Sequence, residues 1–104
     1  MGQGPTFLAG ILRASELVFD AVESTWRDEW PRMELIDRTY YLGTEIDDAD
    51  RYLARLAEAQ ERGELSAEQV ARLNAVTARR QQVAPIIDAM LASLKPTPKR
   101  ESVA

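Results

Sequence analysis

The stretch Arg62-Gly63-Glu64-Leu65-Ser66-Ala67-Glu68-Gln69-Val70 decides the fold of this 104-residue chain. Gly63 suits a position just past a helix end, because glycine adopts the left-handed conformation at little cost. Ser66 and Gln69 have the spacing of a capping box, in which each side chain accepts a hydrogen bond from the other residue's backbone N–H. Leu65 and Val70 occupy the two positions of a hydrophobic staple. A helix stop followed so closely by a capped start predicts a tight turn between two antiparallel helices.

Apolar residues continue on both sides of this turn at the alternating three- and four-residue spacing of packed helices. The stripe before the turn predicts a helix over residues 31–62, and Pro31 suits its first position. That stripe consists of Leu35, Thr39, Leu42, Ile46, Ala49, Leu53, Leu56 and Gln60. The stripe after the turn predicts a helix over residues 67–95, stopped by the following prolines. It consists of Leu73, Val76, Arg80, Val83, Ile87, Met90 and Leu94.

The two stripes match when residues equally distant from the turn are placed at the same level. The pairs are Leu56 with Leu73, Leu53 with Val76, Ile46 with Val83, Leu42 with Ile87, and Leu35 with Leu94. Arg80 interrupts its stripe at the level of the acidic cluster at residues 45–50, so Arg79 and Arg80 are predicted to contact this cluster. Pro85 is level with Gly43, which predicts a kink or a close backbone approach.

A third amphipathic helix is predicted over residues 5–27. Its apolar side contains Leu8, Leu12, Phe19, Val22 and Trp26, with the small Ser15 completing the spacing. A second row makes this side broad, and a helix of that kind usually has two neighbours. The predicted fold class is therefore all-α, with the hairpin and the N-terminal helix forming a three-helix or dimeric bundle. Residues 1–95 are expected to form one domain, and residues 96–104 a disordered tail.

The composition excludes several kinds of chemistry. The chain has no cysteine and no histidine, so disulfides, cysteine or histidine metal sites and a histidine base are impossible. Its 17 acidic and 13 basic residues give a net charge of −4 without a basic stripe, which argues against nucleic-acid binding. No apolar run approaches the roughly 20 residues of a membrane span, and no signal peptide is expected. We expect a cytoplasmic protein with no cofactor, no metal, no membrane contact and no small-molecule substrate.

The preferred functional hypothesis is a non-enzymatic module for protein–protein interaction, such as an assembly subunit, adaptor or inhibitor. Its arginine and alanine bias suggests a bacterial or phage source. A helix of about 22 residues cannot cover both flanks of a hairpin with 30-residue arms about 45 Å long, so a homodimer or another protein partner is expected. The predicted contact residues are the second row of the N-terminal helix and the aromatic residues near the corner: Phe7, Ile11, Val18, Trp26, Trp30 and Tyr41.

Two alternatives remain open. The first is a Mg²⁺-dependent nucleotide phosphohydrolase, because carboxylates three residues apart share a helix face and can hold a hard cation. Its candidate ligands are Glu34, Asp37, Glu45, Asp48, Glu58 and Glu61. All-helical nucleotide pyrophosphohydrolases use Glu-x-x-Glu followed by Glu-x-x-Asp, and the order is reversed here. The second alternative is a DNA-mimic inhibitor in which the acids of residues 20–50 imitate phosphates, although arginines are interleaved with them.

Overall fold

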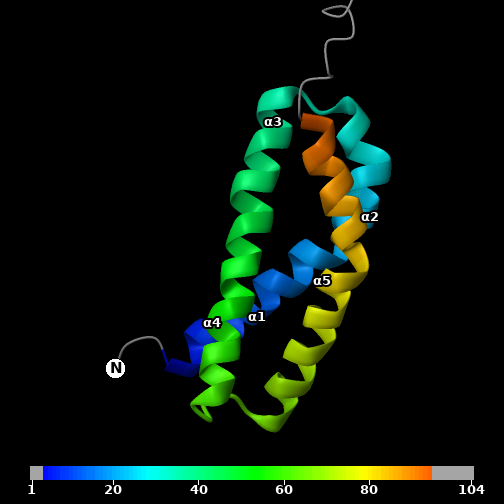
Figure 1. Cartoon of the computed structure of the whole chain (residues 1–104). Helices are drawn as coiled ribbons and strands as arrows, with labels where there is room; N and C mark the ends of the chain where they lie inside the picture. Colours follow the sequence, from blue (N-terminus) through cyan, green and yellow to red (C-terminus); the bar gives the residue numbers. More distant parts are fainter. Residues whose placement is uncertain (1–3, 95–104) are drawn as a thin grey trace, which may run out of the picture.

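The computed structural model describes residues 4–94, and this part of the chain forms helices without a strand (Figure 1). The first rod comprises α1 (Gly4–Asp20), α2 (Val22–Ser24), the π-helical η1 (Thr25–Glu29) and the 3-10 turn η2 (Trp30–Arg32). The second comprises α3 (Leu35–Tyr40), the π-helical η3 (Tyr41–Ile46) and α4 (Asp47–Glu61). The third is the single helix α5 (Ala67–Leu94). The all-α class is confirmed, and the predicted tail at 96–104 lies outside the described residues.

The turn between α4 and α5 has the predicted chemistry. Gly63 has a φ of 72°, in the left-handed region. The N–H groups of Gly63 and Glu64 donate to the carbonyls of Gln60 and Ala59, at 3.0 and 2.9 Å, which is a Schellman ending. The Ser66 N–H donates to Gln69 Oε1 at 2.9 Å, and the Gln69 N–H donates to Ser66 Oγ at 3.1 Å. The stop and start signals therefore satisfy backbone groups at both helix ends.

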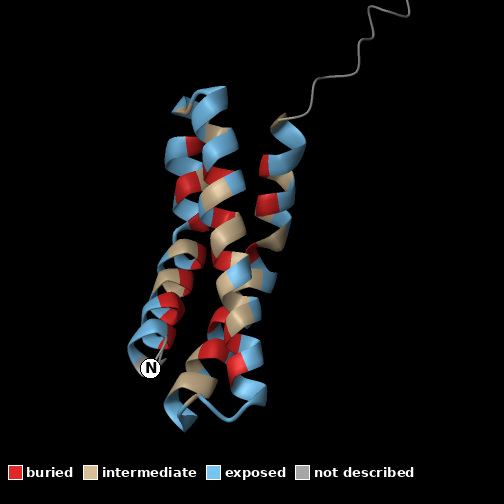
Figure 2. Cartoon of the chain, turned by 90° about the vertical axis from the view of Figure 1, so that its left-hand side faces the viewer, coloured by how far each residue is buried: buried red, intermediate tan, exposed pale blue. Residues whose placement is uncertain are grey.

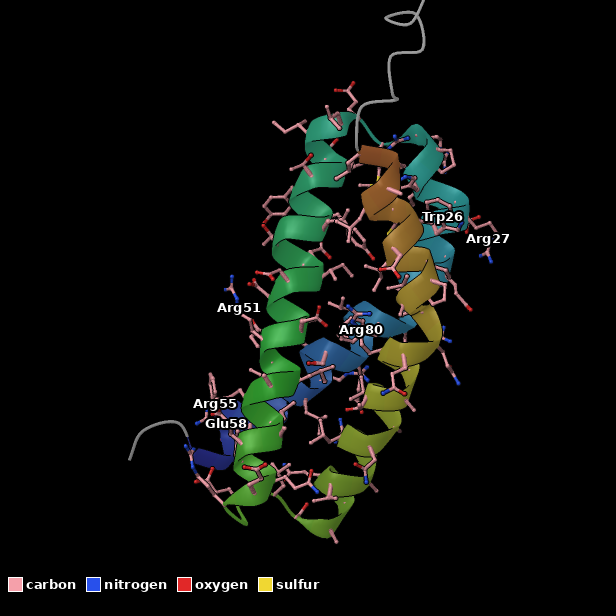
Figure 3. The ribbon with its side chains drawn as sticks, in the orientation of Figure 1. Trp26, Arg27, Arg51, Arg55, Glu58 and Arg80 are labelled. Carbon is pink, nitrogen blue, oxygen red and sulfur yellow. The ribbon has the colours of Figure 1, made fainter. Side chains whose placement is uncertain are left out.

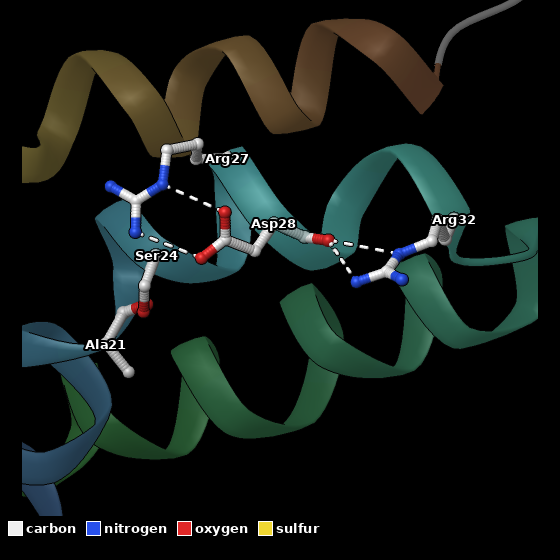
Figure 4. A network of polar contacts seen from close by, with 5 residues as sticks. All are labelled: Ala21, Ser24, Arg27, Asp28 and Arg32. Atoms are coloured by element: carbon white, nitrogen blue, oxygen red, sulfur yellow. Dashed lines mark hydrogen bonds and ion pairs between the residues drawn. The ribbon is translucent and has the colours of Figure 1, made fainter.

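The corner before the hairpin differs from the prediction that its first helix begins at Pro31. Pro31 belongs to the 3-10 turn that closes the first rod, and Leu35 is the first residue of α3. Met33 and Glu34 between them are extended, with ψ of 143° and 163°. Arg32 and Arg38 each donate to a backbone carbonyl at this helix end, that of Asp28 and that of Trp30, and the Trp30 carbonyl also accepts the Met33 N–H at 3.2 Å. Arg32 bonds the Asp28 carbonyl at 2.8 and 3.2 Å, and Figure 4 shows this contact beside the Arg27–Asp28 ion pair.

The helix α1 packs against both α4 and α5 and crosses behind them in the view of Figure 1. Its buried positions turn toward the other rods and its exposed positions turn outward (Figure 2). The buried positions match the predicted stripe, since Leu8, Leu12, Ser15, Phe19 and Val22 are all buried. The Ser15 hydroxyl donates to the Ile11 carbonyl at 2.9 Å, so this small polar residue is satisfied within its own helix. The N-terminal helix therefore covers the hairpin of its own chain.

Of the two arginines predicted to contact the acidic cluster at residues 45–50, Arg80 does so and Arg79 does not. Arg80 lies between the arms (Figure 3) and donates to both carboxylate oxygens of Asp50, at 2.7 and 3.2 Å. Its guanidinium carbon is also 5.6 Å from the centroid of the Phe19 ring. Arg79 does not meet the acidic cluster at residues 45–50. It contacts Glu23 at 3.2 Å and Asp20 at 3.8 Å, because the first rod lies on that side of α5 and presents nearer carboxylates.

The second rod also departs from its predicted stripe at one end. From Ile46, the last residue of η3, onward the expected residues Ile46, Ala49 and Leu56 are buried, whereas Leu35 before η3 is 63% exposed and Thr39 is exposed too. A π-helical turn contains more residues than an α-helical turn, so it changes the face that the preceding residues present. Tyr41 and Leu42 are consequently both buried. The predicted Leu35–Leu94 level pair fails for this reason.

The level match of Pro85 and Gly43 does not produce a close approach. The helix α5 continues through Pro85 to Leu94 as one element. A Cβ atom added to Gly43 would meet nothing within 4 Å, so this glycine is not needed for backbone contact. Gly43 instead lies inside the π-helical η3.

The described chain is elongated, with principal extents of 61 × 23 × 20 Å. One apolar core runs along the three rods, and in α5 it includes Leu73, Val76, Val83, Ile87 and Met90, as the stripe predicts. Between residues 4 and 94, no helix has both the length and the apolar character that a membrane crossing requires.

Candidate interaction surface

The six predicted contact residues lie in different environments. Three of them are buried in the chain's own core, where Ile11, Trp30 and Tyr41 are 7%, 4% and 7% exposed. Phe7 is 38% exposed, while Val18 and Trp26 are half-buried at the edge of the core. The structure therefore does not bring these six side chains onto one surface. Trp30 and Tyr41 instead pack against each other in the core.

An aromatic cluster joins the first rod to the second. The rings of Trp26 and Trp30 are 6.0 Å apart, and Tyr41 meets Trp30 edge-on at 6.3 Å between centroids. Arg38 of α3 places its guanidinium carbon 5.1 Å from the centroid of the Trp30 ring. The same guanidinium donates to the Trp30 carbonyl at 2.7 and 3.1 Å. Edge-on aromatic contacts and a cation over a ring each stabilise such a cluster, so α3 is held firmly against the corner.

Trp30 also links this corner to the third rod. Its indole N–H donates to Ser93 Oγ at 3.2 Å, and the Ser93 hydroxyl donates to the Met90 carbonyl at 2.8 Å. These contacts connect residues 63 positions apart in the sequence. The C-terminal end of α5 is thereby tied to the start of the hairpin.

The Tyr41 hydroxyl is buried among the two π-helical segments. Burial raises the pKa of Tyr41, the neighbouring Thr25 hydroxyl lowers it, and the carboxylates of Glu45 and Glu29 raise it further. Tyr41 Oη has no hydrogen-bond partner of good geometry among the described residues. Tyrosine is neutral at physiological pH even at its ordinary pKa of 10.0, and the upward shift moves ionisation further away, so Tyr41 is a packing element with one unsatisfied polar atom.

Three of the six exposed large hydrophobic side chains of the described residues lie on α3. Leu35, Ile36 and Tyr40 are 63%, 73% and 61% exposed, and we call these three side chains the α3 face. Ile36 and Tyr40 are one helical turn apart, so they lie on the same side of the helix. Sequence reasoning missed the α3 face because it assigned Leu35 to the core. Ile36 and Tyr40 are large apolar residues that fall outside the predicted core stripe, and this could have indicated an exposed apolar face on α3.

A second feature is a charged groove between α1 and α5 with a volume of about 420 Å³. It is lined by two apolar residues, Ala75 and Val76, and by five charged ones: Arg13, Glu16, Asp20, Arg72 and Arg79. Arg72 donates two hydrogen bonds to Glu16, at 2.9 and 2.7 Å. These contacts join residues 56 positions apart and fasten α1 to α5.

The Glu16–Arg72 contact predicts an acid-sensitive contribution to stability. The hydrogen bonds from Arg72 lower the pKa of Glu16 below its ordinary 4.5, burial opposes this shift, and the charges of Arg72 and Arg13 add to it. A group whose pKa is lowered by folding stabilises the protein above the unfolded-state pKa and loses this effect as the pH falls through the folded-state pKa. Glu16→Gln should therefore lower the urea midpoint at about pH 7 and leave it nearly unchanged at about pH 3.

The matched control for that measurement is Glu58→Gln, at an exposed position on α4. It should leave the urea midpoint almost unchanged at both pH values, because exposed charges contribute little. Equal effects of Glu16→Gln at the two pH values would show that the ionised carboxylate is not the stabilising form.

The candidate metal ligands do not gather. Within the described range 4–94, no group of three or more acidic side chains lies close enough to hold a metal ion. In the acidic cluster at residues 45–50, Arg51 contacts Asp47 and lies 3.5 Å from Asp48, and Figure 3 shows it pointing away from the bundle. Asp50 of the same cluster is held by Arg80. Arginines of the same chain thus contact three of its carboxylates.

Comparisons of the chain with protein-family models, with curated proteins and with solved structures gave no match.

Proposed function

We propose that this protein is a non-enzymatic interaction module that binds a protein partner through the α3 face. The observation that carries this proposal is the exposure of three large apolar side chains within one six-residue helix, where Leu35, Ile36 and Tyr40 are each at least 61% exposed. Removing apolar surface from water contributes roughly 25 cal/mol per Å², so covering this face favours association. Tyr40, at the C-terminal end of this face, fits the residue preference of interface hot spots.

The support beneath the α3 face favours binding without a large ordering cost. Arg38 is bonded to the Trp30 carbonyl, and Tyr41 follows directly after α3 and is buried against Trp30. A helix that is already held in its bound conformation loses little conformational freedom on association. The α3 face therefore acts as a fixed ridge rather than a segment that folds on binding.

The shape and charge of the α3 face define the kind of partner. A short helix presenting apolar residues one turn apart fits a concave apolar groove on another protein. Glu34 and Asp37 are exposed at its edges and would favour a groove with a basic rim. Charges at such a rim change the association rate and specificity more than the affinity. An adaptor, an assembly subunit or an inhibitor would each use a surface of this type.

The test compares partner capture by the full chain and by two matched variants in extracts of the source cell. Ile36→Arg places a charge at the centre of the α3 face, and Leu91→Arg makes the same change at a 47% exposed site on α5. A partner of the α3 face should be retained by the wild type and by Leu91→Arg and lost with Ile36→Arg. With the purified partner, Ile36→Arg should weaken binding about 30-fold or more, as expected for a hot-spot residue.

The purified complex offers a second readout. Burial of the apolar α3 face should give a negative heat-capacity change in calorimetric titrations at several temperatures. A partner that binds all three proteins equally well would overturn the assignment to the α3 face.

A further inference from the structure

The outward side of α1 carries a second uncharged surface, separate from the α3 face. Its residues repeat at steps of three and four, and we call them the outer α1 face: Phe7, Gly10, Ala14 and Leu17 of α1, and Ala21 directly after its last residue. Phe7 and Leu17 are 38% and 54% exposed, and a Cβ atom added to Gly10 would meet nothing within 4 Å. The opposite side of α1 is buried in the hairpin. The outer α1 face is therefore an apolar helix surface that its own chain does not cover.

The residue sizes on the outer α1 face match an antiparallel copy of the same face. With a two-fold axis between Ala14 and Leu17, each Leu17 is level with the Ala14 of the other copy. Gly10 is then level with Ala21. A large side chain faces a small one at the central levels, and two small residues face each other beyond them, which allows the helices to approach closely. A two-fold contact of this kind uses the same patch on both molecules.

The charges beside the outer α1 face favour the same arrangement. Arg13 and Asp20 flank the face on one side, and their side chains are 65% and 69% exposed. Within the chain each is held only loosely, since Arg13 is 3.8 Å from Glu16 and Asp20 is 3.8 Å from Arg79. An antiparallel two-fold brings flanks of the same side together. In the register that pairs Leu17 with Ala14, Arg13 of one copy is offset from Asp20 of the other by two residues, or about 3 Å of helix, which an arginine side chain can span. A parallel two-fold would instead place these flanks on opposite sides of the contact, so Arg13 of one copy would not meet Asp20 of the other.

We infer that the outer α1 face is the self-association surface of this protein and that its occupant is the α1 helix of a second copy. The contact extends over about 15 residues, or roughly 22 Å of helix. This is a small interface compared with the 1,200–2,000 Å² typical of stable complexes, so the dimer should be weak and reversible, with a micromolar dissociation constant. The inference does not depend on the α3 face, which lies on another helix and remains free for a different partner.

Sedimentation equilibrium or light scattering of the full chain from about 1 µM to about 1 mM tests the inference. The wild type should change from monomer to dimer within this range. Leu17→Arg should weaken the dimer about 100-fold, because it puts a charge at the centre of the buried patch. Leu91→Arg and Ile36→Arg are the matched controls on exposed apolar residues elsewhere, and both should dimerise like the wild type.

The charges provide the sharper experiment. Arg13→Asp leaves two acidic flanks and Asp20→Arg leaves two basic flanks, so each variant alone should dimerise less than the wild type. Mixed one to one, the two variants should form a heterodimer, and the double variant should recover self-association. Helical circular dichroism checks that each variant is folded. A wild type that stays monomeric at about 1 mM would overturn the inference. So would a dimer that survives Leu17→Arg, or a mixture of the single variants that fails to associate.

Discussion

Phe19→Ala should lower the free energy of unfolding by about 3–5 kcal/mol, the usual cost of deleting a fully buried phenylalanine ring. Phe19 is 0% exposed and is the largest side chain that is fully buried among the described residues. Its ring also lies beneath the Arg80 guanidinium, which is fixed by Asp50. The substitution therefore leaves a cavity between the three rods and removes the apolar surface on which that ion pair rests.

Urea unfolding followed by circular dichroism measures this effect. A domain of this size is typically stable by about 5–15 kcal/mol, so the variant should retain little of its stability. Phe7→Ala is the matched control, because Phe7 is 38% exposed. Measured on dilute protein, this substitution should lower the free energy of unfolding much less. Similar midpoints for the two variants would contradict the central position assigned to Phe19.

Trp30→Ala is expected to have the second largest effect, again about 3–5 kcal/mol. Trp30 is 4% exposed and contacts Tyr41, Trp26 and Arg38. Its indole N–H also reaches Ser93 near the end of α5. Removing this ring should loosen the upper end of the bundle in Figure 1 as well as lower global stability.

Guanidinium unfolding gives the stability of Trp30→Ala, and amide hydrogen exchange shows where protection is lost. Protection should fall first in α3 and in the last turns of α5, because the Trp30 contacts join these segments. Trp26→Ala is the control, since Trp26 is only half-buried and should cost clearly less. Unchanged protection of α3 in Trp30→Ala would show that the corner is held by other contacts.

The turn and the buried stripes could be predicted because the information is local. Gly63, Ser66 and Gln69 act on backbone groups within a few residues of themselves, so their spacing in the sequence already defines the geometry. The α5 stripe and the buried side of α1 follow from helical periodicity alone. The Arg80–Asp50 ion pair was predictable by one further step, the alignment of levels across the turn.

The remaining features depend on contacts between distant segments or on rare backbone geometry. The π-helical segments η1 and η3 leave no clear signal in the sequence, and η3 moves Leu35 from the predicted core to the surface. The partner of Arg79 depends on where the first rod lies, which periodicity does not reveal. The α3 face was missed because the π-helical η3, which places Leu35 at the surface, could not be predicted. The six predicted contact residues were chosen without knowing which side of the N-terminal helix the hairpin would cover.

The packing of α1 against both arms of the hairpin has a consequence for the order of assembly. The Schellman ending and the capping box involve residues close together in the chain, so little loop entropy opposes their formation. The α1 contacts with α5 join residues 56 positions apart and need the arms to be present already. We expect the turn between α4 and α5 to form early and the first rod to pack against the two arms late. Until then, the inner sides of both arms are exposed to water, and crowded nascent chains are most prone to aggregate at this stage.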